Sequence, residues 1–100
     1  MAWTIIYHPD VPGDLRALGR AEARRIVEAI DQRLRLGEPD KTGKTLRQDL
    51  AGCRRLRIGQ TRVVYRVDAK ANEAKRKEVL VIAVGPRRDD EIYRRAKKRS

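Results

Sequence analysis

The stretch that decides the fold is CRRLRIGQTRVVYRV, residues 53–67, in which two runs of alternating apolar and basic residues flank Gly59-Gln60. Alternate side chains of a strand point to opposite faces, so each run has one apolar and one basic face. A glycine-containing pair between two such runs favours a tight turn. The stretch therefore predicts a β-hairpin whose apolar face carries Leu56, Ile58, Val63, Tyr65 and Val67, and whose other face carries Arg55, Arg57, Arg62, Val64 and Arg66.

The amino-terminal half predicts one strand and two helices. Residues 3–8 are rich in β-branched and aromatic residues and indicate a strand, and residues 10–18 indicate a short helix. Residues 20–36 form a longer amphipathic helix, which Gly37 is expected to end with a positive φ, and residues 37–49 form a polar connection. The apolar face of the longer helix is expected to carry Ala23, Ile26, Val27, Ile30 and Leu34.

The carboxyl-terminal half predicts a buried strand and a final helix. Residues 68–78 are almost wholly polar and indicate an exposed loop, whereas residues 79–84 are apolar on both faces, as in a central strand. Asp89 and Asp90 are placed to cap a helix that begins acidic and ends basic. The element order β-α-α-β-β-β-α predicts an α+β fold, with two N-terminal helices and a C-terminal helix packed on a small, mostly antiparallel four-stranded sheet.

The composition indicates a single domain, residues 1–100, with an anionic partner. The formal charge is +11, from 25 Lys and Arg against 14 Asp and Glu, which is more than solubility requires. The one cysteine, Cys53, cannot form an internal disulfide, and the first residues lack a secretory signal, so we expect a cytoplasmic protein. No apolar stretch approaches the length that spans a bilayer, so we expect no membrane association.

The arginines of the hairpin are the candidates for chemistry. One histidine and one cysteine are too few for a zinc site, and no glycine-rich phosphate-binding motif occurs, so we expect neither a metal nor a cofactor. Arg55 and Arg57 are expected about 7 Å apart on one strand face, with Arg62 across from them. Converging guanidinium groups bind phosphate and stabilise the charge that develops when the 2′-hydroxyl of RNA attacks its own phosphate. The pattern fits either a site that cleaves RNA or a solvated basic face of the sheet.

Three features together resemble a known family. The run LRQDLAGCRRLRIGQTRVVY, residues 46–65, is followed by VGPR, residues 84–87, and then by Tyr93. An R-x-x-Y hairpin, a V-G-x-R turn and a late tyrosine in this order resemble the RelE toxins of bacterial toxin–antitoxin pairs. The amino-terminal strand and paired helices fit as well, so the resemblance covers nearly all of the chain as one RelE-like domain.

The resemblance implies a ribosome-dependent endoribonuclease that cuts messenger RNA without a metal. By position, it implies that Arg57 lies near the 2′-hydroxyl, Arg62 at the scissile phosphate and Arg87 near the leaving oxygen, and that Tyr93 stacks on a base. Arg55 and Arg57 stand where the best-known members carry lysines. Because arginine keeps its proton at neutral pH, we expect both residues to act by charge. The implied partners are the ribosome, messenger RNA and a short, acidic, partly disordered antitoxin.

The remaining singled-out side chains are expected to bind RNA or to pack in the core. The excess of positive charge favours non-specific contacts with ribosomal RNA over mere solvation for the basic residues beside the hairpin and in the last helix. These residues are Arg54, Arg66, Arg94, Arg95, Lys97 and Lys98. Trp3, Tyr7, Cys53 and Tyr65 are expected to pack, and His8 to end a strand.

Two alternatives to the ribonuclease stay open. A ParE-like toxin would share the fold and inhibit DNA gyrase without cutting RNA. A basic RNA-binding or ribosome-associated module would keep the fold without catalysis, which the arginines in place of lysines allow.

Overall fold

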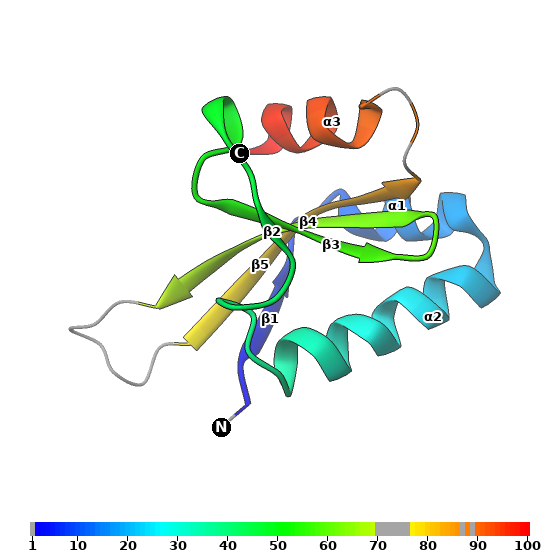
Figure 1. The fold of residues 1–100 in the computed structure, drawn as a ribbon. Coiled ribbons are helices and arrows are strands. Elements are labelled where there is room, and N and C mark those ends of the chain that lie inside the picture. The colour runs from blue at the N-terminus through cyan, green and yellow to red at the C-terminus, as the bar shows by residue number, and fades with distance from the viewer. Residues whose placement is uncertain (1, 70–76, 87, 89) are drawn as a thin grey trace.

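The computed structural model describes residues 2–69, 77–86, 88 and 90–100 (Figure 1). Five strands and three α-helices follow one another in the order that the sequence predicts, apart from one additional short strand. The elements are β1 Thr4–Tyr7, α1 Val11–Leu18, α2 Arg20–Ile30, a π-helical turn Asp31–Arg35, β2 Lys44–Thr45, a 3-10 turn Gln48–Leu50, β3 Cys53–Ile58, β4 Thr61–Ala69, β5 Lys77–Pro86 and α3 Glu91–Arg99.

The sheet has the strand order β1-β5-β4-β3-β2. Only the pairing of β1 with β5 is parallel, which confirms a mostly antiparallel sheet in an α+β fold. The predicted count of four strands is wrong, because the connection 37–49 contains β2, which pairs with β3. Two polar residues are too short a run to show the alternation that reveals a strand, so β2 had no sequence signal.

Helices cover both faces of the sheet. In Figure 1, α2 lies on one side of the strands and α3 lies on the other, and α1 shares the core of α2. The larger core fills the α1 and α2 side, and the predicted apolar face of the hairpin contributes to it: Leu56, Val63 and Tyr65 are fully buried there. The smaller core, under α3, joins strand residues Cys53, Val64, Ile82 and Ala83 to Leu50, Ile92 and Ala96.

The long helix predicted over residues 20–36 changes its pitch. It is α-helical to Ile30 and continues as the π-helical turn to Arg35. Ile26, Ile30 and Leu34 are buried as predicted, but Val27 is 39% exposed. Val27 follows Ile26, and one residue of helix turns a side chain about 100° away from the buried stripe. The expectation for Val27 is therefore wrong.

Gly37 and the strand ends also differ from expectation. Gly37 is not among the glycines with positive φ, so that prediction is wrong. Glycine is needed there because a Cβ would lie 2.4 Å from the backbone oxygen of Arg33. The buried strand predicted over residues 79–84 is longer, since β5 begins at Lys77, and β4 continues to Ala69. Of the loop predicted over 68–78, residues 70–76 lie outside the described residues.

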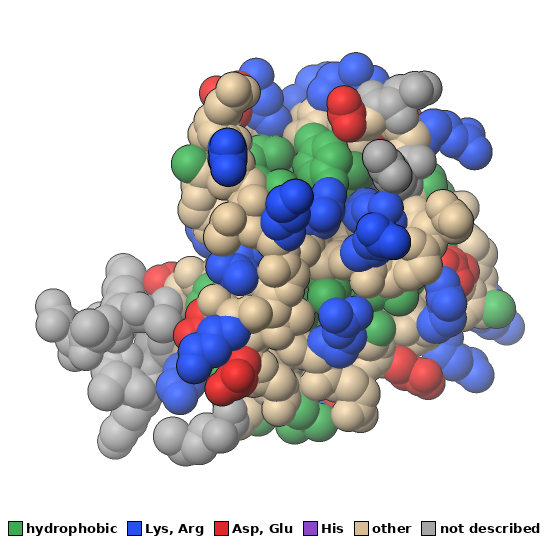
Figure 2. Space-filling view, viewed as in Figure 1, with side chains coloured by type: hydrophobic (Ala, Val, Ile, Leu, Met, Phe, Trp, Pro, Cys, Tyr) green, Lys and Arg blue, Asp and Glu red, His purple; other side chains and the backbone are tan. Residues whose placement is uncertain are grey.

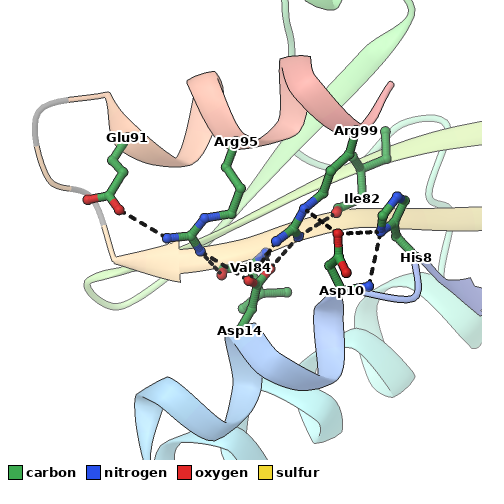
Figure 3. Close-up of polar contacts among 8 residues, drawn as sticks. All are labelled: His8, Asp10, Asp14, Ile82, Val84, Glu91, Arg95 and Arg99. Atoms are coloured by element: carbon green, nitrogen blue, oxygen red, sulfur yellow. Dashed lines mark hydrogen bonds and ion pairs between the residues drawn. The ribbon is translucent and has the colours of Figure 1, made fainter.

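A cluster of charged side chains holds α3 against the sheet beyond the end of β1 (Figure 3). Among the described residues, β5 has no strand partner on this side after Val81, and Asp14 of α1 accepts the Val84 N–H at 3.0 Å. Arg99 donates to the Ile82 carbonyl at 3.0 Å and Arg95 to the Val84 carbonyl at 3.1 Å. Both arginines also bind the Asp14 carboxylate. The cluster satisfies the free edge of β5 and fixes the position of α3.

Candidate nucleic-acid interface

Basic side chains of the hairpin gather on the face of the sheet that α3 partly covers. Arg57 lies directly opposite Arg62 in the register of β3 and β4, and Arg55 lies opposite Val64. Val64 packs under α3, so these arginines share its face, as the alternation predicts. Figure 2 shows Lys and Arg side chains gathered over the sheet below α3. The predicted basic face is confirmed.

A groove of about 730 Å³ lies between this face and α3. Arg55 and Tyr93 meet in it, where Arg55 Nη1 donates to the Tyr93 hydroxyl at 3.1 Å. Arg55 Nε is buried and has no hydrogen-bond partner among the described residues. The lining comes from four places in the chain and consists of Lys44, Thr45, Leu46, Arg47, Leu50, Arg55, Asp90 and Tyr93. This groove is large enough for a nucleotide-sized ligand.

Arg62 and Arg57 differ in exposure although they face each other. Arg62 is only 4% exposed, and its Nη1 donates to the carbonyls of Gly59 at 3.1 Å and Thr61 at 3.4 Å. These bonds hold the guanidinium at the hairpin turn, so it is positioned in advance of any ligand. Arg57 is exposed, and its carbonyl accepts a bond from Arg33 at 3.4 Å. Arg87, the fourth predicted arginine, lies outside the described residues.

The predicted RNA-binding residues divide into two sets. Arg66, Arg94 and Lys98 are exposed, and so is Lys97, which pairs with the exposed Asp49 at 2.8 Å. Arg54 lies opposite Tyr65 and therefore on the other face of the sheet, where its Nε donates to the Thr42 carbonyl at 2.8 Å. Arg95 is bound in the Asp14 cluster. The donors of these last two arginines serve the fold.

Sequence reasoning missed part of the groove lining. It assigned no role to Lys44 or Arg47, which lie in the connection 37–49, and it treated Asp90 as a helix cap. The run that begins at Leu46-Arg47 was part of the family resemblance, and this was the signal that could have placed Arg47 in the groove. The packing predictions hold better, since Trp3, Cys53 and Tyr65 are buried and burial raises the pKa of the Cys53 thiol.

Neither a metal site nor a membrane span is found in the described part of the chain. Over residues 2–69, 77–86, 88 and 90–100, no three His, Cys, Asp or Glu side chains gather to hold a metal ion. Within the same residues, no helix has the length and apolar character needed to cross a bilayer.

The comparisons with known proteins agree with the fold. The sequence model of the ParE toxin of type II toxin–antitoxin systems, parDE, matches residues 5–91. The chain belongs to the ParE toxin family. This assignment, together with the structural neighbours below, confirms the predicted place of the chain in the RelE and ParE superfamily.

Two solved structures resemble this ParE-family chain over most of its length. A chain of the toxin–antitoxin complex RelBE2 from Mycobacterium tuberculosis is 29% identical, with a TM-score of 0.74, covering 87% of this chain and 100% of that one. A double arginine-to-alanine mutant of the E. coli toxin RelE in the free state has a TM-score of 0.66, 23% identity, and coverage of 99% and 98%. The second likeness concerns the fold alone. No curated protein sequence matches the chain.

Proposed function

We propose that this toxin is a ribosome-dependent endoribonuclease that cuts messenger RNA in the cytoplasm. The observation that carries the proposal is the contact between Arg55 and Tyr93 in a groove on the basic face of the hairpin. A guanidinium beside an aromatic ring combines a phosphate ligand with a surface on which a base can stack. Single-stranded RNA offers both groups within one nucleotide.

The proposed reaction uses the RNA, the arginine side chains and water, on a message that the ribosome holds. The 2′-hydroxyl gives its proton to hydroxide or water as its oxygen forms a bond to phosphorus. The bond to the 5′-oxygen breaks, and that oxygen takes a proton from water, which leaves a 2′,3′-cyclic phosphate and a 5′-hydroxyl. Arg62, held at the hairpin turn, would stabilise the negative charge on the phosphate, with Arg57 beside the nucleophile and Arg87 beside the leaving oxygen. The ribosome would hold the messenger RNA so that the 2′-hydroxyl is aligned opposite the 5′-oxygen.

The test is cleavage of messenger RNA on programmed ribosomes, followed by primer extension and by analysis of the new ends. Breaks phased with codons and ending in cyclic phosphate are expected. Arg62→Ala and Arg87→Ala should each lower single-turnover cleavage by about 10²-fold or more, as the loss of a prearranged donor does. Arg66→Ala and Arg94→Ala are the matched controls, and they should mainly weaken binding and flatten its salt dependence.

Equal defects in the two pairs of variants would overturn the assignment of residues. Because Arg62 is buried, the melting temperature of each variant is measured alongside. A folded Arg62→Ala protein that cleaves at an unchanged rate would also overturn the assignment of Arg62.

The second candidate is inhibition of DNA gyrase, which the match to the ParE family model favours. In that case ribosome-bound messenger RNA stays intact and the purified protein blocks supercoiling. The Arg55 contact with Tyr93 favours an RNA ligand over gyrase inhibition, because it places a surface for base stacking beside a phosphate ligand.

We also propose that an acidic antitoxin neutralises the chain. The neighbour RelBE2 was solved as a toxin–antitoxin complex, and a charge of +11 favours an acidic, partly disordered segment that folds as it binds. Expression of the chain alone should arrest growth, and co-expression of an acidic protein encoded beside it should relieve the arrest. Normal growth of cells that accumulate soluble toxin would contradict this.

A further inference from the structure

One carboxylate lies in a groove that otherwise carries positive charge. Asp90 lines the groove together with Lys44, Arg47 and Arg55. An RNA phosphate is drawn to the three cations and repelled by the carboxylate. The backbone of a bound nucleotide is therefore expected on the cationic side. The position beside Asp90 is left for a group that donates hydrogen bonds.

The backbone at Asp90 is unusual for the residue that precedes a helix. Asp90 has φ of 59° and ψ of 17°, in the left-handed region, and its carboxylate makes no capping bond to α3. An aspartate at this position ordinarily accepts a bond from an N–H of the first turn. Gln48, the one other described residue besides glycine with positive φ, lines a neighbouring groove that Asp90 also lines. Such conformations cost free energy and cluster at binding sites.

The position of Asp90 relative to Tyr93 sets what the carboxylate can reach. Tyr93 lies three residues later, one turn of α3 away, and its N–H donates to the Asp90 carbonyl at 3.1 Å. Residues at this spacing share a helix face, and both side chains line the same groove. A base stacked on the Tyr93 ring would therefore turn one edge toward the Asp90 carboxylate.

We propose that Asp90 selects guanine for the groove. This specificity role rests on the proposed function as a ribonuclease. A carboxylate only accepts hydrogen bonds, through two oxygens side by side. The Watson–Crick edge of guanine presents two adjacent donors, N1–H and the 2-amino group. Adenine and cytosine each place an acceptor next to their amino donor, and uracil flanks its one donor with two acceptors. Only guanine matches both oxygens of Asp90.

The first experiment measures nucleotide binding by the free protein, without ribosomes or cleavage. Guanosine, inosine and adenosine 3′-monophosphates are titrated into isotope-labelled protein, and the amide resonances of Tyr93 and Arg55 are followed by NMR. Guanosine monophosphate should bind about tenfold more tightly than adenosine monophosphate, with inosine monophosphate between them because it keeps N1–H and lacks the 2-amino group. Equal affinities, or no binding at millimolar concentration, would overturn the proposal.

Asp90→Asn is the decisive variant, and Glu91→Gln is its matched control. Asparagine tolerates the left-handed conformation and replaces one acceptor by a donor, so the preference for guanosine should disappear. Glu91→Gln removes the same charge one residue away, from a carboxylate bound to Arg95 outside the groove, and should leave the preference intact. A loss of preference in both variants would reduce Asp90 to a general charge effect and contradict the proposal.

A second experiment separates this proposal from the ribonuclease itself. Ribosomes carry messenger RNAs that differ only by guanosine or inosine at one codon position. Wild-type protein should cleave the guanosine message faster by about tenfold at one position, and Asp90→Asn should cleave both at similar rates. Cleavage by the wild type without discrimination refutes the role of Asp90 alone. Preferential binding of guanosine monophosphate without any cleavage would refute the ribonuclease function, and the proposed guanine site would still stand.

Discussion

Two sets of arginines meet in the space between α3 and the sheet, and they differ in what they contact. Arg95 and Arg99 donate to the Asp14 carboxylate and to carbonyls of β5 (Figure 3). The hydrogen bonds with Asp14 raise the pKa of Arg99 above its ordinary range. Arg55 contacts the Tyr93 hydroxyl beside a groove, and its Nε has no partner among the described residues.

The difference teaches that positive charge marks a ligand site only where the fold leaves it uncompensated. Arg95 and Arg55 look alike in the sequence, since each lies in a basic run. The Asp14 carboxylate of α1 already pairs with Arg95, whereas the charged residues that line the groove at Arg55 are three cations and one carboxylate. An external anion can replace water at Arg55 without breaking an internal ion pair.

The largest effect is expected from removing Asp14, which would break the compensated set. Its side chain is 6% exposed and that of Arg99 13%, so Asp14→Ala removes the acceptor of the Val84 N–H and the carboxylate that pairs with Arg95 and Arg99. We expect a loss of about 3 kcal/mol in the free energy of unfolding. Urea denaturation measures this loss.

The control for Asp14 is an exposed ion pair of α3, between Lys97 and Asp49. Lys97 and Asp49 are 59% and 65% exposed, so Asp49→Ala should cost less than about 0.5 kcal/mol. Comparable losses in the two variants would show that the Asp14 cluster is no more important than a surface ion pair.

The contrast between these two arginine sets also shows which parts of the structure can be predicted from the sequence. Alternation in residues 53–67 predicted both faces of the hairpin, because a strand puts every second side chain on one side. Nothing local indicates that Asp14 meets Arg99, 85 residues later, so Arg95 was predicted to bind RNA. The alternation of residues in a sequence predicts which face of a strand each side chain lies on. The partners of that side chain depend on how the helices and strands pack together.

For the candidate site, too, the sequence predicted the faces of the residues and not their partners. Arg55, Arg57 and Arg62 lie on the predicted face, and the late tyrosine meets Arg55 in the groove. Asp90 was predicted as a cap because aspartate before a helix ordinarily caps it. The left-handed backbone that leaves its carboxylate without a capping bond has no sequence signal, since aspartate adopts both conformations.

A smaller effect is expected on the opposite face of the sheet, at Tyr65. Its hydroxyl lies 2.9 Å from the Pro39 carbonyl and 2.6 Å from that of Thr42, and it ties the connection 37–49 to the core. Tyr65→Phe should lower the free energy of unfolding by about 1–2 kcal/mol. Because the connection also carries Lys44 and Arg47, the same variant would test whether the groove depends on this tie.

The pH dependence of stability provides a separate check on Tyr65. Burial raises its pKa above the ordinary value, as it does for Tyr7 and Cys53. A group whose pKa is higher in the folded state contributes stability below its unfolded pKa, and this contribution is lost as the pH rises through the folded value. The wild type should therefore lose stability above about pH 10, and Tyr65→Phe should lose less. Parallel curves for the two proteins would contradict the assignment.

The smallest effect is expected from varying the pH of cleavage between 6 and 8, and it tests whether the arginines assigned to cleavage act by charge. Arginine and tyrosine side chains ordinarily titrate above about pH 10, so no assigned group changes its charge in this range. Single-turnover cleavage should be flat, or rise steadily if hydroxide removes the proton of the 2′-hydroxyl. A bell-shaped profile centred near pH 7 would contradict this, because it requires a group that titrates there. His8, whose Nδ1 accepts the Asp10 N–H at 3.1 Å, is the one histidine of the chain. If the His8→Ala variant kept a bell-shaped pH profile, the titrating group would belong to the ribosome or would be an arginine with a depressed pKa.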